Sequence, residues 1–212
     1  MSHTTRVLVT IATALAVSLT GFQPDTPADE PVVRAPAVDI VPEPADPVGL
    51  DIQADAQEWH DLFEWAESRF SSVGLEMPAA LVTVTPGEDR CGGNAGRYRP
   101  GDVPEVHICV DRDPASKVSK LIVLHELAHL WAENRMDDSA RAEFLAVRGL
   151  DSWIDFDIPP HEWGAEHVAE VLSWGLMDES VRIIRIYDAS PEALTEAFGV
   201  VTGTEPLVPL ET

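Results

Sequence analysis

The segment His125-Glu126-Leu127-Ala128-His129 combines residue types and spacing that suit a metal site. In a helix, residues four apart lie one turn apart on the same face, so His125 and His129 can present their imidazoles to one ion. Glu126 is rotated by about 100° from His125 and can reach a water molecule on the ion rather than the ion itself. The spacing therefore predicts a zinc site with a carboxylate base beside it.

A zinc ion that performs catalysis usually takes three protein ligands and leaves a fourth position to water, so a third ligand is needed. A histidine six residues after His129 would be one solution, but Arg135 stands there. The other solution is a carboxylate on a later helix. Glu166 and Glu170 lie one turn apart in such a segment, and we expect the third ligand there.

With these residues the chain resembles the gluzincins, the zincin metallopeptidases whose third zinc ligand is a Glu, and in particular their short single-domain members. The resemblance rests on His125, Glu126 and His129, and on Glu166 followed four residues later by Glu170. It implies that Glu166 is the third ligand of one Zn²⁺ ion and that Glu170 hydrogen-bonds a ligand histidine. Such a carboxylate fixes the tautomer of the histidine. Glu170 stands where the family often has Asp, so an exchange of the two roles remains an alternative.

The resemblance implies hydrolysis of peptide bonds in a peptide or protein substrate, by a zinc-activated water with Glu126 as the general base. His161 and His167 lie near the second segment and are alternative ligands; with Tyr187 they are also candidate donors to the oxyanion. A second hypothesis is a catalytically inactive zincin-like module that binds a partner in the cell envelope. A third is a non-metallic envelope interaction protein in which the motif occurs by chance.

The N-terminal residues 1–22 have the pattern of a secretory signal peptide, because a short cationic start ending at Arg6 precedes an uncharged apolar run over 7–19. The run is shorter than the roughly 20 apolar residues that a membrane span needs. We therefore expect a secreted or cell-envelope protein that contacts the membrane only if the signal stays uncleaved. Residues 23–48 are rich in Pro and acidic residues and predict a disordered linker, which leaves 49–212 as the folded domain.

Acidic residues outnumber basic ones, with 37 Asp and Glu against 14 Lys and Arg and a formal net charge of -23. Such a charge repels phosphate backbones. We therefore expect no nucleic acid among the partners.

Two cysteines, Cys91 and Cys109, are present. In a chain expected to be exported, an even count favours a disulfide bond over free thiols. Closing this loop should stabilise the fold by about 3 kcal/mol in the chain-entropy model.

The elements that position these residues follow from apolar periodicity and from start and stop signals. The sequence predicts helices over 54–70, 114–134, 139–148, 160–176 and 191–199, strands over 81–84 and 106–110, and a glycine-rich turn over 91–99. Asp113-Pro114 and Pro159-Pro160 mark the starts of the second and fourth of these helices, and Gly149 and Gly199 mark the ends of the third and the last. The strand over 106–110 is a candidate edge for binding an extended peptide. We expect an α+β fold, a small zincin-like domain in which a short antiparallel sheet or hairpin packs on the zinc-bearing helix and on a following ligand-bearing helix.

Overall fold

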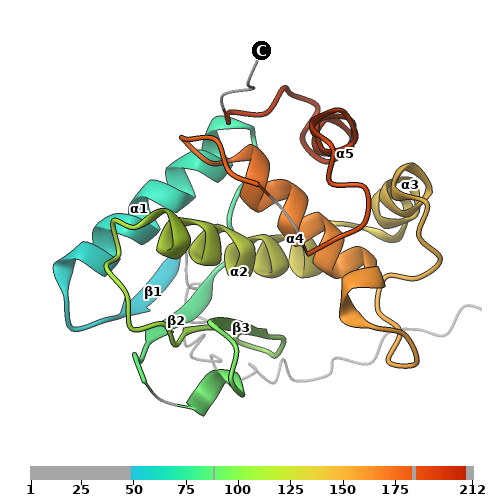
Figure 1. Ribbon diagram of the computed structural model, residues 1–212. Helices are drawn as coiled ribbons and strands as arrows, with labels where there is room; N and C mark the ends of the chain where they lie inside the picture. The colour runs from blue at the N-terminus through green and yellow to red at the C-terminus, as the bar shows by residue number, and fades with distance from the viewer. Residues whose placement is uncertain (1–48, 88, 183–184, 209–212) are drawn as a thin grey trace, which may run out of the picture. The chain divides into compact units, whose positions relative to one another are not determined.

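The computed structural model describes residues 49–87, 89–182 and 185–208. The expected signal peptide over 1–22 and the expected linker over 23–48 lie outside the described residues. Within the described part, the fold is α+β, with five α-helices, two short 3-10 helices and a four-stranded sheet (Figure 1). None of the helices in this part is long and apolar enough to cross a membrane.

The four strands form one mixed sheet in the order β1-β2-β4-β3. Their bounds are Leu50–Gln53 for β1, Ala80–Val84 for β2, Gly96–Arg99 for β3 and Glu105–Ile108 for β4. β1 and β4 both run parallel to β2, and β3 runs antiparallel to β4. The expected antiparallel pairing is therefore present in the β3–β4 hairpin, whereas the sheet as a whole is mixed. Helix α1 (Gln57–Ser72) carries the chain back between β1 and β2, which makes that pair parallel.

The strand expected over 106–110 exists as β4, but it is an inner strand. β4 pairs with β2 on one side and with β3 on the other, so its backbone cannot accept a further strand. The edge strand next to β4 is β3, which lies inside the segment that the sequence predicts to be a turn. Its four residues, GRYR, do alternate in burial, but the run is short and follows several glycines, which favoured the prediction of a turn.

Helix α1 covers the sheet with the apolar face that the sequence predicts. Its side chains belong to the same core as Val82, Val106 and Ile108 of the sheet. Fully burying a side chain of this size contributes about 1.5 to 3 kcal/mol, so this contact is a main source of stability. The buried residues of α1 are Trp59, Leu62, Phe63, Ala66 and Phe70.

Helix α2 spans Lys117–Arg135 and begins later than the Asp113-Pro114 pair predicts. Ser116 is its N-cap, because the Ser116 hydroxyl accepts a hydrogen bond from the backbone N–H of Ser119 at 3.2 Å. The Asp113 carboxylate instead accepts from a backbone N–H within the preceding turn. An aspartate followed by proline marks a turn as well as a helix start, which explains the error.

The later helices differ from expectation at their ends. The Pro159-Pro160 pair opens only a 3-10 turn, because Trp163 is extended and separates that turn from the next helix. The last helix passes through Gly199 and ends at Gly203, where φ is 70°. Gly149 ends its helix as predicted, with φ of 64°. The bounds are Asp138–Arg148 for α3, Pro160–Glu162 for the 3-10 turn η2, Gly164–Gly175 for α4 and Pro191–Thr202 for α5.

Helix α2 lies between the sheet and α4, as Figure 1 shows. Side chains on two sides of α2 are therefore removed from water, and so are nearly all residues of α4. A charged side chain buried between these elements is costly unless it has a partner. The charged residues at this contact therefore require an explanation, and they are the residues of the metal motif.

Candidate metal centre

His125 and His129 lie on the face of α2 that meets α4. Their Nε2 atoms are 3.1 Å apart, and their rings meet edge to face with an interplanar angle of 83°. Only 12% of the His125 side chain and 14% of the His129 side chain are exposed. The helix therefore directs one nitrogen of each ring to a common point at the edge of the core.

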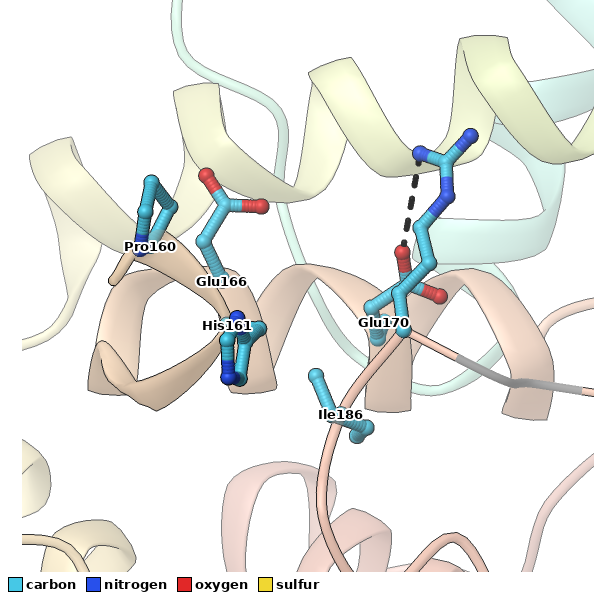
Figure 2. Close-up of a pocket in the computed structure, with 6 residues that line it drawn as sticks. Pro160, His161, Glu166, Glu170 and Ile186 are labelled. Carbon is cyan, nitrogen blue, oxygen red and sulfur yellow. Dashed lines mark ion pairs between the residues drawn. The ribbon is translucent and has the colours of Figure 1, made fainter.

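Glu166 reaches the same point from the first turn of α4. Its Oε2 lies 3.6 Å from Nε2 of His125, and its Oε1 lies 3.5 Å from Nε2 of His129. Figure 2 shows the Glu166 carboxylate extending from α4 toward α2. Among the described residues these three side chains form a group that could hold a metal ion. We refer to them as the His-His-Glu group.

The separations in the His-His-Glu group fit a tetrahedral ion. Ligand atoms held at about 2.0 to 2.1 Å from a tetrahedral zinc lie about 3.3 to 3.4 Å from one another. The two imidazole nitrogens are 3.1 Å apart, and each lies 3.5 or 3.6 Å from a different oxygen of the Glu166 carboxylate. These distances are close to the tetrahedral value, and two imidazoles with one carboxylate are a ligand set that suits such an ion.

Glu170 occupies a different position although it lies one turn further along α4. Its Oε1 is 3.4 Å from Nδ1 of His125, the ring nitrogen that faces away from the His-His-Glu group. A proton on Nδ1 directed at Glu170 leaves the lone pair of Nε2 for a metal. This geometry favours Glu166 as the ligand and Glu170 as the residue that orients His125. Glu170 also has a positively charged neighbour, because Nη1 of Arg185 lies 3.9 Å from its Oε1 (Figure 2).

The carboxylates at this contact perturb the neighbouring pKa values. Burial lowers the pKa of His125, but the nearby Glu166 carboxylate and the charges of Glu126 and Glu170 outweigh burial and raise the pKa above 6.5. Burial raises the pKa of Glu166, but the two histidines that face its oxygens outweigh burial and hold the pKa far below its ordinary value of 4.5. The site therefore favours a cation between the two helices, either a proton on His125 or a metal ion.

Glu126 lies beside the His-His-Glu group without joining it. It is 7% exposed and faces strand β3, where Gly96 is its immediate neighbour. Burial raises the pKa of the Glu126 carboxyl above 4.5, while the charges of His125 and His129 oppose this rise. A divalent ion on the group would lower that pKa further and keep Glu126 ionised.

The other three candidates lie in separate surroundings. His167 is fully buried, and both its ring nitrogens have partners: Arg148 Nε donates to Nδ1 at 3.2 Å, and Nε2 lies 3.0 Å from the carbonyl oxygen of His161. Burial lowers the pKa of His167 to about 4. His161 and Tyr187 pair with each other on the surface, at 3.0 Å between Nε2 and the hydroxyl. None of the three joins the His-His-Glu group.

A cavity of about 320 Å³ adjoins the two glutamates on α4. His161 lines it, whereas Tyr187 lines a separate, smaller cavity. Figure 2 shows this space with its labelled walls. Sequence patterns gave no signal for the contribution of Arg185, because it comes from an irregular segment. The lining residues are Pro160, His161, Glu166, Glu170, Arg185 and Ile186.

The expected disulfide between Cys91 and Cys109 is present, with a Cα–Cα distance of 6.2 Å. It joins the 3-10 turn η1 (Asp89–Cys91) to the residue after β4. Because β4 pairs with β3, the bond anchors the part of the sheet that faces Glu126.

Comparisons of the chain with protein-family models and with curated proteins found no match. The chemistry of the site therefore has to follow from its own residues and their geometry.

Proposed function

We propose that the protein is an exported zinc metallopeptidase of the gluzincin type, with a zincin-like domain, that hydrolyses peptide bonds. His125, His129 and Glu166 hold one Zn²⁺ ion, and Glu126 is the general base. The observation that carries the proposal is the place of Glu126, which is buried next to His125 on α2, against β3, and yet stays outside the His-His-Glu group. A structural zinc site is closed by four protein ligands and has no use for such a carboxylate.

When bound, the zinc ion supplies a Lewis acid that lowers the pKa of a coordinated water to about 7 and polarises a carbonyl group. The Glu126 carboxylate accepts the proton of the attacking water and later delivers it to the leaving amine. The burial of Glu126 limits competing solvent and strengthens its electrostatic interactions. Glu170 holds the ring of His125 in the orientation that binding requires.

Among the described residues no strand pairs with the outer edge of β3, and this edge supports a peptide as the substrate. The N–H of Cys109 donates to the carbonyl of Ala95 at 2.9 Å, which makes Ala95 a hydrogen-bonded position of the β3–β4 pair. Because such positions alternate along an antiparallel pair, the backbone groups of Gly96 and Tyr98 point away from β4. A peptide that adds to this edge would pair with the backbone groups of Gly96 and with the carbonyl of Tyr98, next to Glu126, whose carboxylate already accepts a hydrogen bond from the N–H of Tyr98.

The disulfide agrees with export. Disulfide bonds persist in oxidising surroundings such as the bacterial periplasm and the extracellular space, and are rare in the cytosol. The bond between Cys91 and Cys109 therefore supports the interpretation of residues 1–22 as a secretory signal.

The test is mass spectrometry of a mixed peptide library after incubation with the zinc-loaded protein. We expect cleavage by the wild type, and a turnover lower by about 10² to 10⁴ for Glu126→Gln at equal zinc content, because the base is lost while the ligands remain. Glu143→Gln, which changes an exposed glutamate of α3, is the matched control and should cleave like the wild type.

Two outcomes would contradict the proposal. Zinc bound at full occupancy with no cleavage by the wild type would favour a catalytically inactive zincin-like binding module. Failure of the wild type to retain zinc would remove the metal site itself.

A further inference from the structure

Strand β3 touches Glu126 at a residue without a side chain. A Cβ placed on Gly96 would lie 2.6 Å from Cγ of Glu126, 2.7 Å from its Oε1 and 2.9 Å from its Cδ. All three distances are shorter than the contacts that a Cβ atom makes in a folded protein, so only glycine fits at position 96 while Glu126 keeps its position.

The backbone conformation at position 96 does not explain why the residue there is a glycine. Gly96 is absent from the positive-φ glycines of the described residues, so its conformation is open to any residue. Gly96 is the first residue of β3, and glycine in a strand is unfavourable because it loses more backbone entropy on folding than other residues and has no side chain to pack. The glycine is therefore explained by the space that its missing side chain leaves, which the Glu126 side chain fills.

Neither partner of this contact is free to retreat. On the β4 side, Gly96 pairs with Ile108. The N–H of Cys109 donates to the carbonyl of Ala95 at 2.9 Å, and the disulfide bond fixes Cys109 in turn. On the other side, Glu126 belongs to the buried face of α2 between the sheet and α4. The backbone amide of Tyr98 also interacts with the Glu126 carboxylate.

We propose that Gly96 is a positioning residue for Glu126: the missing side chain on the edge strand β3 provides the space that directs the Glu126 carboxylate. The role of that carboxylate as a base rests on the proposed function, whereas the contact itself does not. The same strand then offers the peptide-binding edge and fixes the base, so the peptide and the base are aligned by one element.

A stability cycle tests the contact without any measurement of activity. Gly96→Ala should lower the Tm of the metal-free protein by roughly 2 to 12 °C, because it overpacks a closed space. The same drop should occur in the Glu126→Gln background, since Gln has the size of Glu. In the Glu126→Ala background it should vanish, because the space is then open. If the effect of Gly96→Ala depends on the size of residue 126 and not on its charge, the two residues are in steric contact.

Activity is the second readout. In the full-length, zinc-loaded protein, Gly96→Ala should lower kcat roughly 100-fold with KM and zinc content unchanged, because a displacement of about 1 Å is enough for such a loss. Gly101→Ala is the matched control in the same hairpin, where the nearest atom to a new Cβ is a carbonyl oxygen at an ordinary 3.5 Å. That control should keep both the Tm and kcat of the wild type.

The outcomes separate this proposal from the proposed function. An equal drop in Tm for Gly96→Ala in all three backgrounds, or an unchanged kcat in an active protein, would overturn the positioning role. A wild type that cleaves no peptide would sink the peptidase proposal, and the size-dependent coupling in Tm would still support the contact between Gly96 and Glu126.

Discussion

Two faces of helix α4 carry ionisable residues that are neighbours in the sequence and opposite in environment. Glu166 faces α2, where its two oxygens approach two histidines at 3.5 and 3.6 Å, near the separations of metal ligands. His167, the next residue, faces α3 and is fully buried with a partner on each ring nitrogen. One face holds polar atoms that converge on a point, and the other holds polar atoms that are already paired.

The difference separates a candidate site from a structural contact. Arg148 of α3 donates to His167 and to backbone carbonyls of the segment before α5, including that of Asp188 at 3.0 Å. A fully satisfied network of this kind ties elements together and leaves nothing for a ligand. On the other face, the Glu166 carboxylate faces the two histidines, and they offer it a positive charge only as protonated rings or through a metal ion that they bind.

The largest expected effect is the difference in zinc affinity between two variants, each of which removes one side chain from a different face of α4. Glu166→Ala should weaken zinc binding by more than about 100-fold, because a ligand contributes more than the residues that merely support ligands. His167→Ala should change zinc affinity by less than about tenfold and should instead lower the Tm, because it breaks the contact with Arg148. Isothermal titration with zinc and thermal unfolding of both variants would measure this. Similar zinc affinities in the two variants would refute the division of roles.

A smaller loss should follow from removing Glu170. Glu170→Ala should weaken zinc binding about 10- to 100-fold, because His125 loses the partner on Nδ1. Glu170→Gln keeps an oxygen that can accept the same hydrogen bond, so we expect a smaller loss for it. If Glu170→Ala weakens binding more than Glu166→Ala does, the two glutamates have exchanged roles.

The pH dependence of zinc affinity should report the raised pKa of His125. Zinc needs neutral imidazole, so a proton on His125 competes with the metal. The pKa lies above 6.5, hence the competition should begin above pH 6.5, and affinity should fall by about tenfold per pH unit below that pKa. Titrations between pH 5 and 8.5 in the presence of a competing chelator would follow it. Constant affinity down to pH 6 would contradict the expected proton.

The smallest effect belongs to the other face. His167 has a pKa of about 4 when folded and 6.5 as the ordinary value, so between these values the unfolded chain binds a proton that the folded protein does not. The free energy of unfolding should therefore fall as the pH drops from 6.5 toward 4. In His167→Gln, measured beside the wild type in the metal-free form, this part of the pH dependence should be missing. Parallel curves for the two proteins would rule out the neutral, buried state of His167.

The sequence by itself determined the features that depend on a few consecutive residues. Helical geometry alone puts His125 and His129 one turn apart, and the structure places their Nε2 atoms 3.1 Å from each other. Apolar spacing located α1, and the glycine at 149 located the end of α3, because both signals act within one or two turns. The cysteine pair was predictable from its count.

Only the tertiary structure decided which glutamate approaches the two histidines and which orients one of them. Glu166 and Glu170 are equivalent as a pattern on a helix face, and the packing of α4 against α2 makes them different. The same holds for β3, whose pairing with β4 and contact with Glu126 gave Gly96 a purpose that no local pattern reveals. Local signals record what a segment prefers alone, whereas strand direction and convergence of side chains depend on which distant segments pack together.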